Sequence, residues 1–90
     1  MLQTISIVVS GKVQGVYYRQ STKEKALVIG VSGTVKNLKD GNVFIVATGT
    51  KEQLEQLSKW CKQGPPGANV VNVIVEDVPL MLFEKFSIVQ

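Results

Sequence analysis

The fold of this chain is decided around the stretch Ser10-Gly11-Lys12-Val13-Gln14-Gly15-Val16-Tyr17-Tyr18-Arg19, which joins a strand-like run to a helix-like run. A glycine-bearing loop of this kind directs free backbone N–H groups at whatever lies above the helix start, and this arrangement suits an anion. Arg19, the only arginine of the chain, falls in the first helical turn, where a cation opposes the helix dipole unless an anion lies between them. The position indicates a phosphate or carboxylate site, although an arginine that merely faces solvent at a helix start fits the loop equally well.

The residues on either side of this loop predict regular elements. Apolar residues alternate over residues 2–10, which indicates a half-buried strand, and recur at helical spacing over residues 19–29 up to a C-cap at Gly30. Residues 31–38 and Val43–Thr48 then predict two strands, because Asp40-Gly41 between them is a strong hairpin signal.

The second half of the chain repeats the order of helix and strand. A capping box at Thr50–Gln53 begins a helix whose apolar stripe is Leu54, Leu57 and Cys61, and the turn Gly64-Pro65-Pro66-Gly67 ends it. β-Branched residues predict a strand from Val70 to Val78, and a short final strand contains Phe86 and Ile88.

The order βαββαβ followed by a small strand predicts an α+β fold of the ferredoxin-like kind, an antiparallel sheet with two helices on one face. A right-handed crossover makes the first and second strands parallel in direction, so their carboxyl ends lie at the same edge of the sheet. We therefore expect the Gly11–Arg19 loop at the same end as Asn37. Asparagine is depleted in strands, but one tolerated near a hairpin is the simpler explanation of Asn37 on these residues alone.

Composition restricts the chemistry. Ninety residues, 44% hydrophobic and 19% charged, predict a single globular domain over residues 1–90. Histidine is absent, which removes a phosphohistidine intermediate, Ser-His and Cys-His nucleophile pairs and any histidine-ligated zinc site. The single cysteine, Cys61, cannot form an internal disulfide and is expected to be a small buried hydrophobe.

Charge and hydropathy bear on partners and location. The net charge is +3, and the nine lysines are spread without a run, which indicates a solvated surface before a nucleic-acid patch. No signal peptide and no apolar stretch of about 18 residues is present, so we expect a cytoplasmic protein without a membrane partner. The spread of the lysines leads us to expect no nucleic-acid partner. A monomer is the simplest expectation for a domain of this size, although the sequence leaves the oligomeric state open.

Other motifs do not carry a function. Lys12 after Gly11 suggests a Walker A loop, but Ser6 occupies the first glycine position and Val13 the position of the required Ser or Thr. The adjacent carboxylates Glu76 and Asp77 lie in a predicted strand and point to opposite faces, so they are not a paired acid-base site.

Two segments resemble the signatures of the acylphosphatase family. The first segment, Gly11-Lys12-Val13-Gln14-Gly15-Val16-Tyr17-Tyr18-Arg19, is similar to the family's motif Gly-x-Val-Gln-Gly-Val-x-Phe-Arg. The second segment, Gly33-Thr34-Val35-Lys36-Asn37, matches the motif Gly-x-Val-x-Asn and is followed by the family's Asp-Gly-x-Val hairpin. The Gly64–Ala68 turn and the closing Phe86-Ser87-Ile88 also match. The resemblance covers nearly the whole chain, and the spacing of two motifs makes it specific.

The resemblance implies an enzyme that hydrolyses acyl phosphates to a carboxylate and phosphate without a metal or another cofactor. It implies that the phosphoryl group is held by Arg19 and by the backbone of Gln14, Gly15, Val16, Tyr17 and Tyr18, and that Asn37 orients the attacking water. The partners implied are a small-molecule acyl phosphate and inorganic phosphate as product or competitive ligand.

Two positions depart from the family. Tyr18 stands where phenylalanine is usual, which is expected to add a hydroxyl near the site, and Phe44 stands where many relatives carry glutamate. A different class of function, a non-catalytic anion-binding or regulatory module on the same scaffold, would need Arg19 but would have little use for Asn37. Binding of single-stranded RNA would need basic and aromatic clustering that the sequence lacks.

Overall fold

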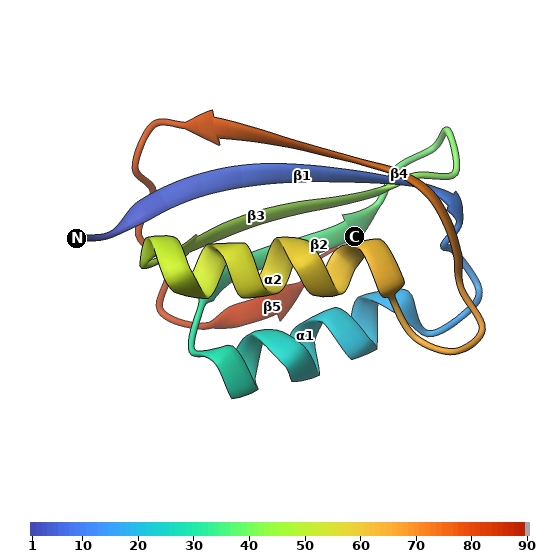
Figure 1. Ribbon diagram of the computed structural model, residues 1–90, viewed down its shortest axis with the longest axis horizontal. Helices are drawn as coiled ribbons and strands as arrows, with labels where there is room; N and C mark the ends of the chain where they lie inside the picture. Colours follow the sequence, from blue (N-terminus) through green and yellow to red (C-terminus); the bar gives the residue numbers. More distant parts are fainter. Residues whose placement is uncertain (90) are drawn as a thin grey trace.

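Two helices cover one face of a five-stranded sheet in the computed structural model, which describes residues 1–89 (Figure 1). The order along the chain is βαββαβ with a short closing strand, as predicted. The elements are β1 (Gln3–Lys12), α1 (Tyr18–Ile29), β2 (Ser32–Asn37), β3 (Val43–Gly49), α2 (Lys51–Gln63), β4 (Asn69–Val78) and β5 (Phe86–Ile88).

The strands are arranged in the order β4-β1-β3-β2-β5. β1 is antiparallel to β3 and β4, and β3 is antiparallel to β2. β1 and β2 therefore run in the same direction with β3 between them, which confirms the ferredoxin-like prediction and places their carboxyl ends at one edge. The sequence pattern predicted an antiparallel sheet, whereas β5 pairs with β2 in parallel and makes the sheet mixed.

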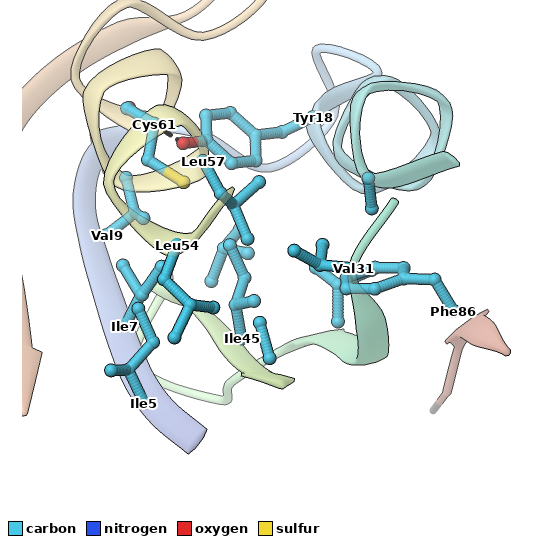
Figure 2. Close-up of a cluster of buried hydrophobic side chains, with 14 of the residues drawn as sticks. Ile5, Ile7, Val9, Tyr18, Val31, Ile45, Leu54, Leu57, Cys61 and Phe86 are labelled. Atoms are coloured by element: carbon cyan, nitrogen blue, oxygen red, sulfur yellow. Dashed lines mark hydrogen bonds between the residues drawn. The ribbon is translucent and has the colours of Figure 1, made fainter. Parts of the chain in front are cut away.

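The core lies between the sheet and the helices. Ile5, Ile7 and Val9 alternate onto the helix-facing side of β1 and are almost fully buried. Figure 2 shows them beside Leu54 and Leu57 of α2, with Cys61 further along the same helix. Burial of such side chains contributes about 1.5–3 kcal/mol each, and it fixes which face of α2 meets the sheet.

Local signals set the ends of the elements. Thr50 and Gln53 form both hydrogen bonds of the predicted capping box, and Gly30 takes a left-handed conformation as the C-cap of α1. β1 continues two residues beyond the predicted Ser10, through a bulge at Ser10/Gly11. Gly11 is required there, because its φ is 122° and a Cβ would collide with the backbone of Asn69.

Candidate functional site

The loop between β1 and α1 has a backbone shaped by two left-handed residues. Gly15 has φ 74° and Tyr17 has φ 70°, and Tyr17 is the only described residue other than glycine with a positive φ. Tyr17 is the N-cap of α1, yet its side chain caps no backbone N–H. Successive left-handed turns of this kind aim neighbouring N–H groups in a common direction.

The N–H groups of this loop have no partner within residues 1–89. From Gln14 to Gln20 no backbone N–H donates a hydrogen bond to any described residue, and the first donor of α1 is Ser21, to the Tyr17 oxygen at 3.0 Å. The start of a helix always leaves such donors, and its dipole adds about half a positive charge. The first turn of α1 carries Arg19 and no acidic residue, so the whole helix start attracts an anion.

A cavity of about 420 Å³ adjoins this loop. Four of the predicted site residues line it, namely Gly15, Tyr17, Tyr18 and Arg19, and they are joined by Val13, Gln20 and Ile88. Arg19 is half-buried and is one of the residues that line the cavity. The sequence pattern missed Val13, Gln20 and Ile88; Ile88 reaches the site because β5 runs parallel to β2.

Asn37 is the last residue of β2, and it is not among the residues that line this cavity. Its Oδ1 atom is the single buried side-chain oxygen or nitrogen of residues 1–89 that lacks a hydrogen-bond partner. A buried acceptor without a partner costs about 1–3 kcal/mol. Such a cost at a predicted site residue indicates that its partner is a water or a ligand.

Gln14 ties the loop to the hairpin that follows Asn37. Its side-chain amide donates to the oxygens of Leu38 and Asn42, each at 2.8 Å. The loop after β1 and the end of β2 are thus held together at one edge of the sheet, as the topology predicted. The resemblance implied only a backbone role for Gln14 and did not identify this side-chain contact.

The expectation that Tyr18 adds a hydroxyl near the site is wrong. Its side chain is 1% exposed, and its hydroxyl donates to the Cys61 oxygen at 2.8 Å in the core, as Figure 2 shows. The ring packs beside Trp60, with 5.5 Å between ring centroids. Although Tyr18 is among the residues that line the cavity, its hydroxyl lies between the helices and not at the anion loop.

The turn after α2 packs against Val16 and Tyr18, near the end of the loop. A Cβ on Gly64 would lie 2.8 Å from the Tyr18 ring, and one on Gly67 would lie 3.6 Å from the Val16 Cβ. Gly64 therefore allows the backbone of this turn to pack directly against the Tyr18 ring, whereas Gly67 lies at an ordinary contact distance from Val16.

Within residues 1–89, no three His, Cys, Asp or Glu side chains gather as metal ligands would. Neither described helix combines the length and the apolar character needed to cross a lipid bilayer.

Comparison with known proteins gives the family. A family model described as Acylphosphatase matches residues 5–88. The chain belongs to the acylphosphatase family. An acylphosphatase of Pelotomaculum thermopropionicum is 54% identical over 70 residues, covering 78% of this chain and 76% of the relative. One of Acaryochloris marina is 46% identical over 86 residues, covering 96% and 92%.

Solved acylphosphatases have the same fold. The crystal structure of the Bacillus subtilis acylphosphatase superposes with a TM-score of 0.95 at 35% identity, covering all of both chains. The acylphosphatase of Coxiella burnetii gives 0.94 at 39% identity, covering 97% of this chain and 92% of that one. With the family and these identities the chain is an acylphosphatase enzyme, and hydrolysis of an acyl phosphate is its class of reaction.

Proposed function

We propose that this acylphosphatase holds the phosphoryl group of its substrate between the Arg19 guanidinium and the backbone N–H groups of Gln14 to Tyr18, and that Asn37 orients the attacking water. The observation that carries the proposal is the row of N–H groups from Gln14 to Gln20, which have no partner within residues 1–89, beside a half-buried Arg19. Of these residues, Gly15, Tyr17, Tyr18, Arg19 and Gln20 line one cavity.

Hydrolysis of an acyl phosphate needs little more than groups that bind the phosphoryl oxygens and a positioned water. Water attacks phosphorus as the bond from phosphorus to the acyl oxygen breaks, and the carboxylate leaves with the bonding pair. A carboxylate is a weak base, so it needs no proton in order to leave. Catalysis then rests on in-line positioning and on stabilising the charge of the equatorial oxygens. A planar guanidinium and fixed amides supply both without a metal.

The remaining role, orientation of the attacking water, falls to Asn37. Its unpartnered Oδ1 accepts a hydrogen bond from the water, and its amide is too weak a base to take the proton. The proton passes to an oxygen of the phosphoryl dianion, which yields phosphate and restores the enzyme. All of these groups come from one chain, so the proposal includes a monomer as the working unit.

The test is hydrolysis of benzoyl phosphate in excess chelator by the wild type and by Arg19→Ala. Lys23→Ala is the matched control, since it removes one positive charge from the same helix. We expect rapid turnover by the wild type and the control, and near-background turnover by Arg19→Ala. If the folded wild type bound phosphate and hydrolysed nothing, the proposal would be replaced by a non-catalytic anion-binding module.

A further inference from the structure

Tyr17 holds a conformation that its side chain does not favour. A left-handed φ of 70° brings the Cβ of an L-residue close to its own carbonyl oxygen, which glycine avoids and which asparagine tolerates best among the others. Gly15, two residues earlier, has a similar φ of 74° but avoids this close contact because it has no Cβ. A tyrosine at this position is therefore a cost to the folded state.

The fold does not use the Tyr17 side chain. The residue is 72% exposed, so it covers little of the core, and its side chain forms no capping hydrogen bond at the start of α1. Strained residues that contribute nothing to packing concentrate at sites of function. The aromatic ring of Tyr17 is accordingly a candidate for contact with a ligand.

The cavity shows which part of a substrate that ring would meet. Its volume of about 420 Å³ lies in the range of about 300–1,000 Å³ typical of small organic ligands, so it has room beyond a phosphate. Arg19 and the loop amides take the phosphoryl end. The acyl group is joined to phosphorus through one oxygen, so it must lie within a few bonds of them, among the other side chains of the lining.

Those side chains are mainly apolar or aromatic. Besides Tyr17 they are the partly buried Ile88 and Gln20, with Val13 and Tyr18 almost fully buried beneath them, and Arg19 is the only cation of the lining. An acyl group with its own carboxylate would find no second cation there. A flat apolar acyl group would instead pack on the Tyr17 ring, as aromatic pairs do.

We propose that Tyr17 is a specificity-determining residue, whose exposed ring at the cavity selects aromatic acyl phosphates over small aliphatic ones. This inference rests on the proposed function, because it assumes that the phosphoryl group occupies the Arg19 loop. The contact is equal in the ground state and the transition state, so its loss raises KM for the aromatic substrate and leaves kcat for that substrate little changed.

The experiment compares kcat/KM for benzoyl phosphate with kcat/KM for acetyl phosphate in four proteins. These are the wild type, Tyr17→Phe, which keeps the ring, and Tyr17→Asn and Tyr17→Gly, which remove the ring and suit a left-handed backbone. The ratio of the two constants within each protein cancels any general change in the loop. We expect Tyr17→Phe to keep the ratio, and the other two variants to lower it by about 3- to 10-fold through KM for benzoyl phosphate.

Thermal unfolding separates this role from a structural one. Tyr17→Asn and Tyr17→Gly should not lower the unfolding midpoint, because they relieve the strained φ. An unchanged ratio in both, with the wild type active on both substrates, would overturn the role of Tyr17 and leave the proposed function intact. A wild type inactive on both substrates would overturn the proposed function and this inference together. A lower ratio that arose from kcat alone would assign Tyr17 to positioning and contradict selection by contact.

Discussion

The Tyr18 hydroxyl donates to the main-chain oxygen of Cys61, and this bond replaces a helical one. The carbonyl of Cys61 would ordinarily accept from the N–H four residues later, but that residue is Pro65, which has none. At 2.8 Å the phenol supplies the missing donor. The residue that begins α1 thus completes the last turn of α2 and joins the anion loop to the core.

Removal of that hydroxyl should lower stability. Tyr18→Phe leaves the buried Cys61 oxygen without its donor, so we expect a loss of about 1–2 kcal/mol, or roughly 4–15 °C in the unfolding midpoint. Urea and thermal unfolding measure this effect. Tyr17→Phe is the matched control, because it deletes the same group from an exposed ring. Equal midpoints for the two variants would show that the Tyr18 hydroxyl contributes nothing.

Arg19→Lys tests the geometry of the clamp separately from its charge. Lysine keeps the positive charge but lacks the planar fork that matches two phosphoryl oxygens. We expect kcat/KM for benzoyl phosphate to fall by about 10²-fold or more, with an unchanged unfolding midpoint. Near-normal turnover would contradict the bidentate role and reduce Arg19 to a point charge.

Asn37→Ala should separate activity from stability. The Oδ1 atom has no partner in the described structure, so its removal takes away a buried unsatisfied acceptor and should not destabilise the fold. We expect kcat to fall by about 10²-fold while the affinity for inorganic phosphate, measured by competitive inhibition with residual turnover or by calorimetry, stays near that of the wild type. Loss of phosphate binding as well would make Asn37 a structural residue.

Gln14→Glu should loosen the loop from the hairpin. A carboxylate in place of the amide faces the oxygens of Leu38 and Asn42 and repels both. We expect weaker phosphate binding and a loss of about 1–3 kcal/mol in stability. Gln56→Glu adds the same charge at an exposed position of α2 and should change neither phosphate binding nor stability. If Gln56→Glu weakened both to the same extent, the effect of Gln14→Glu would be due to net charge and not to the lost contact.

Because the thiol of Cys61 is buried, we expect the stability of the protein to fall in alkaline solution. Burial raises the pKa of Cys61 from its ordinary 9.0 to about 12, although the Tyr18 hydroxyl opposes part of the rise. Above about pH 9 the unfolded chain loses this proton while the folded chain keeps it, so stability falls as pH rises, by about 1.4 kcal/mol per pH unit.

Cys61→Ala should remove that contribution. Between about pH 8 and pH 10.5 we expect the wild type to lose about 2 kcal/mol more than Cys61→Ala does in urea unfolding. Burial also raises the pKa of Tyr18, so both proteins should lose further stability at higher pH. Equal losses for the two proteins up to pH 10.5 would contradict a thiol that stays protonated in the folded state.

The sequence predicted the features that local signals encode. The element order and the edge shared by the Gly11–Arg19 loop and Asn37 follow from apolar periodicity, the hairpin at Asp40-Gly41 and the handedness of crossovers. These signals act within a few residues or through a general rule of topology, and the structure confirms both predictions.

Other features depend on contacts between distant segments. The direction of the Tyr18 hydroxyl is set by Pro65 and the end of α2, and no local pattern around Tyr18 reports that. The parallel pairing of β5 with β2, which brings Ile88 to the cavity, depends on the path of the segment before Phe86. Side-chain contacts such as that of Gln14 with Leu38 likewise require the packed structure.

The composition of the cavity has a consequence for biosynthesis. Val13 and Ile88 both line it, so its walls come from nearly opposite ends of the described sequence. A nascent chain held on a ribosome would carry Arg19 and the anion loop long before the segment containing Ile88 emerged. We therefore expect catalytic competence to appear only after the segment through Ile88 has emerged and β5 has joined the sheet, and not progressively as the preceding residues are added.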